Sequence, residues 1–136
     1  MTFDPARSLA RVMGGMGALH FLAPKPFDAI VPRALPGNPR VYTYASGAAE
    51  LAVAAALALP RTRRAGGLAA AGLIAAVFPA NVQMAYDWRK RPAPLKALAY
   101  GRLPLQVPLA AWALLAARQG AAEAAETTAA STGDRG

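Results

Sequence analysis

Apolar residues are gathered in four long blocks along the chain, and each block is bounded by charged residues or proline. The blocks cover residues 8–23, 41–60, 65–86 and 102–118. A helix rises ~1.5 Å per residue, so a block of about twenty residues crosses the ~30 Å hydrocarbon core of a membrane. The pattern therefore predicts an all-α protein, a bundle of four transmembrane helices with two interfacial lid loops on one side.

A soluble four-helix bundle is the main alternative, but it requires a charged outer face on every helix. Glu50 is the only acidic or basic residue between Arg40 and Arg61, and none occurs between Arg64 and Asp87. A cleaved signal peptide is a second alternative for block 8–23. That block, however, ends in LHFLAPKPF rather than in a small-x-small cleavage site. Four membrane spans fit the pattern better than either alternative.

The connections between the blocks differ on the two sides of the predicted bundle. Segments 25–40 and 89–104 are rich in proline, so we expect neither to form a long helix and both to lie along the membrane interface as lids, near Tyr86, Trp88 and Tyr100. The tight turn PRTRR favours a cytoplasmic location for itself and both termini of a multi-pass protein. Residues 1–118 form the predicted domain, and the polar segment 119–136 is predicted to be a disordered tail.

The composition limits the chemistry that the chain can perform. Its 136 residues suffice for one small domain, and the absence of cysteine excludes disulfides, thiol redox couples and thiolate metal sites. The net charge is +8, but the basic residues lie between apolar blocks, which favours lipid headgroups over nucleic acid as partners. No HExxH motif or nucleophile motif occurs, so we assign no catalytic or metal-ligating residue and expect no catalytic activity from the chain alone.

A few polar residues interrupt the apolar blocks, and they fall in the half of each span nearest the lid loops. A central charge costs roughly 2–3.5 kcal/mol in a membrane helix, so such groups need partners. Pro79 and Pro108 each free a further backbone carbonyl. We therefore predict a shared polar pocket under the lids, with the candidate ligand-binding residues His20, Ser46, Glu50, Asn81, Gln83 and Gln106.

Glu50 is the most informative of these residues because it lies too deep for its side chain to reach the headgroups easily. It must be protonated, paired, or solvated in a cavity. We hypothesise that His20 and Glu50 form a charge-coupled pair that binds a polar headgroup or moves a proton. The alternative is that the polar residues only join the helices, through interhelical hydrogen bonds of about 0.6 kcal/mol each.

Four motifs occur in order along the chain: HFLAPKPFDAIVP, SGAAEL, VFPANVQMA and RLPLQVPLAAW. Together they resemble the DoxX-like family of small bacterial membrane proteins, over residues 8–117. The resemblance implies four transmembrane helices in the inner membrane, with both termini cytoplasmic. Some members of that family are membrane subunits of quinone-linked sulfur-oxidising enzymes, and others belong to oxidative-stress complexes. The polar pocket that the resemblance implies consists of His20, Pro24, Gly47, Glu50, Asn81 and Gln106.

Two functions from different classes are consistent with these observations. In the first, the protein is a DoxX-like membrane module whose pocket binds a small amphipathic molecule, a quinone or a lipid headgroup, as accessory subunit of a membrane oxidoreductase system. In the second, it is a scaffold that holds partner proteins in the membrane and binds no ligand. An enzyme acting on its own has less support. The partners considered are the lipid bilayer, an oxidoreductase protein and a second copy of the chain, and quinone is the candidate cofactor.

Overall fold

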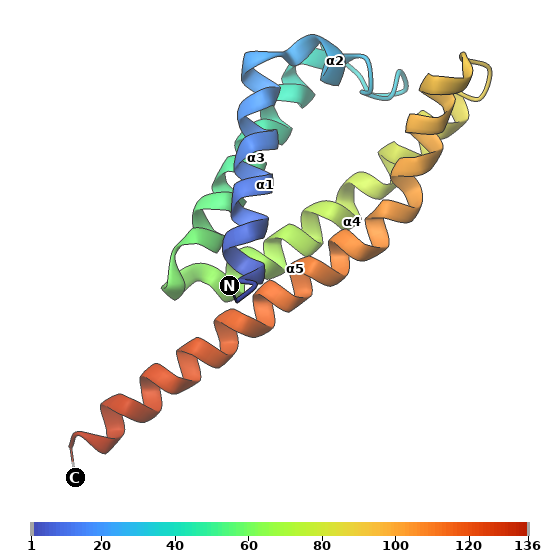
Figure 1. Cartoon of the computed structure of the whole chain (residues 1–136). Helices are drawn as coiled ribbons and strands as arrows, with labels where there is room; N and C mark the ends of the chain where they lie inside the picture. Colours follow the sequence, from blue (N-terminus) through green and yellow to red (C-terminus); the bar gives the residue numbers. More distant parts are fainter. Residues whose placement is uncertain (1, 136) are drawn as a thin grey trace.

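The computed structural model describes residues 2–135, and every regular element in that part of the chain is helical. The predicted all-α class is confirmed. Four of the helices are long, and a short helix, α2, is additional to the four that the sequence predicts. The elements are α1 (Pro5–Leu22), α2 (Pro24–Asp28), α3 (Pro39–Ala58), the 3-10 turn η1 (Pro60–Thr62), α4 (Arg63–Asp87) and α5 (Ala93–Gly133) (Figure 1).

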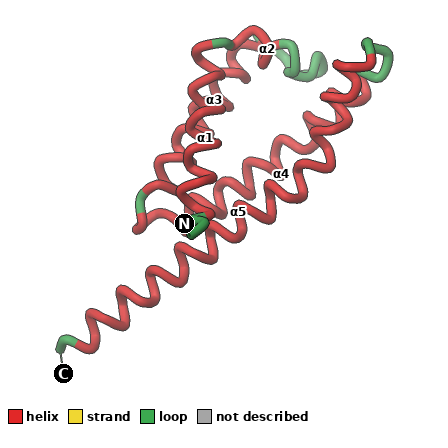
Figure 2. The backbone as a smooth tube through the Cα atoms, viewed as in Figure 1, coloured by secondary structure: helices red, strands yellow, loops and turns green. Residues whose placement is uncertain are grey.

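The long helices form two antiparallel hairpins that meet at one end of the molecule. Helices α1 and α3 make the first hairpin, and α4 and α5 make the second (Figure 1). The hairpins touch where the chain starts and where η1 joins α3 to α4, and we call this end the base. Away from the base the hairpins diverge, while α5 continues past the base as a single protruding helix (Figure 2).

The irregular segment between α2 and α3 extends from the first hairpin toward the second at the end opposite the base (Figure 2). Its residue Ile30 packs against a small buried cluster formed by Met84, Ala85 and Ala99 of the second hairpin. The expectation that segment 25–40 forms no long helix is met, because its one helix, Pro24–Asp28, has five residues. The hairpins are therefore in contact at both ends of the molecule.

Two of the long helices begin with a capping residue followed by proline. The Asp4 side chain accepts a hydrogen bond from the Arg7 amide at 3.0 Å, and Asn38 accepts one from the Arg40 amide at 2.9 Å. Proline follows each cap. The first residue of a helix has no helical acceptor for its amide proton, so proline, which lacks that proton, costs no hydrogen bond there. The bond from Arg7 holds the pKa of the Asp4 carboxyl below its usual range. These local signals fix where α1 and α3 start.

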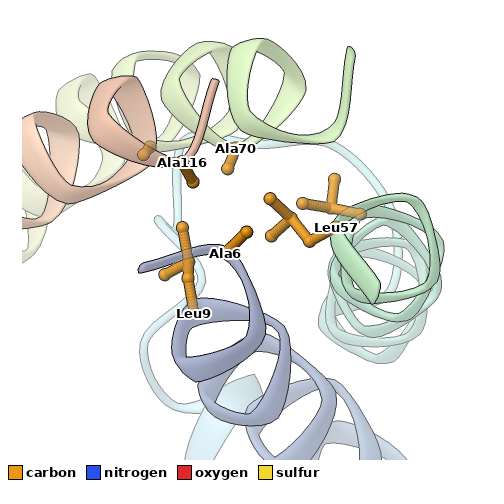
Figure 3. Close-up of a cluster of buried hydrophobic side chains, with 7 residues drawn as sticks. Ala6, Leu9, Leu57, Ala70 and Ala116 are labelled. Atoms are coloured by element: carbon orange, nitrogen blue, oxygen red, sulfur yellow. The ribbon is translucent and has the colours of Figure 1, made fainter. Parts of the chain in front are cut away.

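The larger apolar cluster lies at the base and contains residues from all four long helices. Leu9 and Leu57 are its two large, fully buried members, and most of the others are alanines (Figure 3). The alanines in the cluster are Ala6, Ala70, Ala113 and Ala116. Small side chains let helices approach closely, and close packing stabilises helix contacts in lipid, where apolar surface gains little by leaving the solvent. The base is therefore the best-packed part of the protein.

A buried arginine ties the helices together at the base. The Arg63 side chain is only 3% exposed, and its Nη1 donates to both carboxylate oxygens of Glu123 at 2.7 Å. Its Nε donates to the carbonyl oxygen of Leu57 at 3.1 Å. Gln119 donates to Glu123 at 3.0 Å and accepts a hydrogen bond from the Ala6 amide at 3.1 Å. Arg63 therefore connects the end of α3 with α5, and Gln119 extends the network to α1.

The fourth predicted block is where the structure differs most from the sequence-based expectation. The sequence predicts a helix over 102–118 between a lid loop and a disordered tail, whereas α5 runs from Ala93 to Gly133. A proline lies in the first turn of α5, where it does no harm, and Pro104 and Pro108 lie inside the helix without ending it. Residues 93–104 and 119–133 are therefore helical, which corrects both expectations.

Two helical segments are long and apolar enough to cross a membrane. They are Pro39–Ala58, which is α3, and Pro60–Asp87, which comprises η1 and α4. Helices α1 and α5 do not meet the same measure. Two arginines lower the hydropathy of α1, and prolines, Arg102 and Gln106 lower that of the first half of α5. The structure thus supports a membrane location through two of the four predicted spans.

Candidate functional site

His20 of α1 and Glu50 of α3 lie next to each other in the first hairpin. The Nδ1 atom of the buried His20 is 3.3 Å from Oε2 of Glu50, whose side chain is 20% exposed. The same Nδ1 is 2.7 Å from the backbone carbonyl oxygen of Met16. When Nδ1 carries a proton, the hydrogen bond goes to that carbonyl. Glu50 then stands at ion-pair distance, and its Oε2 atom is buried without a hydrogen bond.

Gly47 is the reason that α1 and α3 come close enough for this contact. A Cβ atom at position 47 would lie 2.7 Å from the Cβ of His20 and 2.8 Å from the Phe21 ring. Both distances are below the limit for real contacts, so only glycine fits there without moving α1. Ser46, which the sequence places in the pocket, is half-buried one turn before Glu50. The first hairpin thus brings His20 and Glu50 together, and Ser46 lies one helical turn before Glu50 on α3.

Helix α2 covers the end of the first hairpin above His20. The Phe27 ring stacks on the His20 ring with centroids 3.8 Å apart. The Asp28 carboxylate accepts hydrogen bonds from Thr43 at 2.6 Å and from Nε of Arg40 at 2.8 Å. These bonds, that from Arg40 above all, hold the pKa of Asp28 below its usual range. The sequence-based analysis missed this arrangement, although Phe27 and Asp28 stand in the motif HFLAPKPFDAIVP.

Asn81 of α4 pairs with Arg102 of α5 in the second hairpin. The buried Asn81 accepts a hydrogen bond from Nε of Arg102 through its Oδ1 atom at 3.3 Å. This bond orients the carboxamide, so that Nδ2 is left buried without a partner. Gln106 lies one turn after Arg102, and its Oε1 atom is also buried and unpaired. The sequence-based analysis missed Arg102, although its spacing of four residues from Gln106 places both on one face of a helix.

Gln83 does not join these residues. Its Nε2 atom donates to the Asp87 carboxylate at 2.9 Å, at the exposed end of α4. The helical turn explains the difference, because positions 81, 84 and 85 are buried whereas position 83 is only half-buried. Of the six predicted residues, the structure brings together His20 with Glu50 and Asn81 with the helix face of Gln106, whereas Ser46 and Gln83 form no hydrogen bond or ion pair with them within residues 2–135.

We call His20, Glu50, Asn81, Arg102 and Gln106 the polar cluster. Three atoms of the cluster are buried without a hydrogen-bond partner within residues 2–135: Glu50 Oε2, Asn81 Nδ2 and Gln106 Oε1. The first belongs to the first hairpin and the other two to the second. The cluster therefore offers one unpaired donor and two unpaired acceptors.

Two cavities are present elsewhere in the described part of the chain. One, of about 320 Å³, lies near the base between α1 and α3 beside Arg7 and Arg11. The other, of about 300 Å³, lies at the opposite end, between the segment after α2 and the end of α4. Neither is lined by a residue of the polar cluster. Within residues 2–135, no group of three or more His, Cys, Asp or Glu side chains could hold a metal ion.

The fold and the cluster define an all-helical protein with two helices able to span a membrane and a set of unpaired buried polar atoms. Residues 9–117 match the model of a protein family described as a domain of unknown function, DUF8561, and the chain belongs to that family. No curated protein and no solved structure matches the chain. The matched region contains the entire polar cluster, whereas Gln119 and Glu123 of the base lie outside it.

Proposed function

We propose that the protein is a DoxX-like, four-span membrane protein whose polar cluster binds the head of a small amphipathic molecule, a quinone or a lipid headgroup. The observation that carries the proposal is the group of three unpaired buried atoms on Glu50, Asn81 and Gln106. An unpaired buried polar atom costs about 1–3 kcal/mol. A bound ligand that supplies the missing partners would remove that cost at all three positions.

Exposed apolar side chains on every long helix support four spans rather than two. They include Val12, Met16 and Leu19 of α1 and Leu51 of α3, with similar residues on the second hairpin. In water such extensive apolar exposure is unfavourable, whereas in a bilayer it faces lipid. With four spans both termini lie on the side of the base, which we assign to the cytoplasm from the PRTRR turn. The apolar residues exposed on the second hairpin include Leu68, Phe78, Val82, Leu95, Leu98, Leu105, Val107, Leu114 and Leu115.

The atoms of the polar cluster match a ligand that carries both carbonyl and hydroxyl groups. Nδ2 of Asn81 is a donor that suits a carbonyl oxygen, whereas the Glu50 carboxylate is an acceptor that suits a hydroxyl. A quinone supplies the first group and its reduced form the second, and lipid headgroups supply both. The bridging segment 29–38 and helix α2 act as the lid over this site. The role as accessory subunit of an oxidoreductase rests on the resemblance to DoxX-like proteins.

A scaffold role is the second candidate, and the protruding end of α5 favours it. Residues 124–133 extend beyond the base and are exposed (Figure 1). They are anchored to the base through Glu123 and Gln119, so the extension leaves the protein in a fixed direction. A rigid, exposed helix on the cytoplasmic side is suited to contact with a soluble partner. This role requires no ligand in the polar cluster.

Extraction and rebinding together test the proposal. Molecules that copurify with the protein are extracted and identified by mass spectrometry, and the stripped protein is titrated with a short-chain quinone or a lipid while thermal unfolding is followed. We expect one class of molecule to raise the unfolding temperature of the wild type and of Gln83→Leu, the control outside the cluster, but not that of Glu50→Gln. Equal stabilisation of all three variants would contradict the proposed site.

A further inference from the structure

The cavity at the end opposite the base lies between the two hairpins, and four of its nine lining residues are charged. Its volume is about 300 Å³. The segment after α2 contributes Ile30, Val31 and Arg33, and the end of α4 with the turn that follows contributes Trp88 and Arg91, among others. Because the lining comes from both hairpins, an occupant would bridge them where the helices have diverged (Figure 2). We call this space the interfacial cavity.

Positive charge dominates the interfacial cavity. Three guanidinium groups, those of Arg33, Arg89 and Arg91, line it together with one carboxylate, that of Asp87. Arg89 is partly engaged, since its Nη1 donates to the Tyr86 carbonyl at 2.7 Å. Within residues 2–135, Arg33 and Arg91 form no ion pair. Two arginines are therefore free to bind an anion.

The aromatic residues around the cavity place it at the level of lipid headgroups. Trp88 lines the cavity, and the Arg89 guanidinium lies 3.9 Å from the centroid of the Tyr86 ring. Tryptophan and tyrosine gather where membrane helices leave the hydrocarbon core. Phosphate groups lie at this level, and a guanidinium binds phosphate through two parallel hydrogen bonds. The apolar residues Ile30 and Val31 border the same space, as acyl-chain contacts require.

We propose that the interfacial cavity binds a phosphate group, supplied by an anionic lipid headgroup or by free phosphate, through Arg33 and Arg91. The site is separate from the polar cluster, because no residue is shared between them. Bound phosphate joins the segment after α2 to the turn between α4 and α5. It therefore holds the two hairpins together at the end where the large apolar cluster of the base is absent.

Lys90 supplies a matched control. It lies between Arg89 and Arg91 in the sequence and is exposed, but it does not line the cavity. Lys90→Gln removes one positive charge from the same turn without removing a proposed ligand. We compare Lys90→Gln with Arg91→Gln and with the double variant Arg33→Gln/Arg91→Gln. This comparison separates a specific binding site from general attraction between a basic protein and an acidic surface.

The experiment measures thermal unfolding and lipid retention by native mass spectrometry for the full chain in detergent. The probes are phosphatidylglycerol, phosphatidylcholine and inorganic phosphate. We expect phosphatidylglycerol to stabilise the wild type and Lys90→Gln, and the double variant to bind it at least about tenfold more weakly, as the loss of charge-assisted hydrogen bonds implies. Stabilisation by inorganic phosphate that requires the same two arginines supports the site with free phosphate as its source.

Two results would overturn the proposal. One is equal loss of phosphatidylglycerol binding in Lys90→Gln and in Arg91→Gln, which would indicate diffuse attraction. The other is the absence of any stabilisation by either phosphate source. The double change Arg33→Gln/Arg91→Gln is also made in a Glu50→Gln background, because Glu50→Gln alters the polar cluster alone. The loss of phosphatidylglycerol binding caused by the double change should be the same with and without Glu50→Gln, so failure of this site and failure of the polar cluster give different results.

Discussion

At the base, every nitrogen of the buried Arg63 guanidinium has an acceptor, in Glu123 or in the carbonyl groups of Leu57 and Ala58. In the polar cluster, three buried atoms have no hydrogen-bond partner within residues 2–135. Both regions bury polar groups in a largely apolar protein, but only the base satisfies them. A saturated network contributes to the stability of the fold, whereas unpaired groups persist where a function needs them. The comparison therefore predicts opposite responses to substitution.

Removal of Glu123 should have the largest effect. Glu123→Ala leaves the Arg63 charge, 3% exposed, without its carboxylate partner. Because Glu123 is itself 35% exposed, the cost is that of leaving one buried charged donor without its partner, about 3 kcal/mol. We expect a fall of that size in the free energy of unfolding, measured by titration with sodium dodecyl sulfate in mixed micelles. Glu126→Ala, on an exposed position of the same helix, is the control. Equal stability of the two variants would show that the Arg63 network does not hold the base.

Gly120 should come next, because α5 lies very close to the start of α4 there. A Cβ atom at this position would lie 2.4 Å from the backbone nitrogen of Arg64. Gly120→Ala must push the helices apart, and we expect a loss of about 2 kcal/mol, the usual size for overpacking. Gly101→Ala is the control in the same helix, since nothing lies within 4 Å of its added Cβ. The contact would be unimportant if both variants unfolded at the same denaturant concentration.

Substitution of Gln106 should have a small effect of opposite sign. Gln106→Leu removes a buried acceptor that has no partner in the protein, so the ligand-free variant should be as stable as the wild type or up to about 1 kcal/mol more stable. The same variant should retain less of the copurifying molecule. The unfolding titration and extraction assay described above measure both quantities. A loss of stability like that of Glu123→Ala would mean that Gln106 is a structural tie.

The smallest predicted effect concerns pH and helix α2. Hydrogen bonds from Arg40 and Thr43 lower the pKa of Asp28 from 3.8, so its charged form stabilises the fold above that pH, and the contribution is lost as the pH falls through the lowered value. The unfolding temperature of the wild type should fall in this range more than that of Asp28→Asn. The pKa of Asp4 is also lowered, so part of the fall in unfolding temperature should remain in both the wild type and Asp28→Asn. Identical pH profiles would show that Asp28 does not hold α2.

Three of the four predicted helices agree with the structure because their limits are local signals. Predicted blocks 8–23, 41–60 and 65–86 correspond to α1, α3 and α4, whose ends lie at capping residues, prolines and charges that a sequence displays directly. Part of the length of α5 depends on tertiary contacts instead. Gln119 and Glu123 look like parts of a polar tail until Arg63 and Ala6 are placed beside them. These contacts account for the helix as far as Glu123, whereas the exposed, alanine-rich residues beyond it are helical through local propensity.

The candidate site was predictable in part for a similar reason. His20, Glu50, Asn81 and Gln106 stand out because they are polar residues in apolar blocks, and the structure buries atoms of each. Arg102 and Asp28 were missed because each lies at or beyond the end of an apolar block, where a charged side chain is expected to face solvent or headgroups. The structure places Gln83 beside Asp87 and apart from this group, since distance along a span does not specify the face of the helix on which a side chain lies.

The central claim is that the polar cluster binds a molecule whereas the base does not. The most direct test compares two identical chemical changes, Glu50→Gln and Glu123→Gln, by native mass spectrometry of gently extracted protein. Our account predicts that a discrete small molecule remains on the wild type and on folded Glu123→Gln but is absent from Glu50→Gln. Retention of the same molecule by Glu50→Gln, or its absence from the wild type, would contradict the account and favour a scaffold.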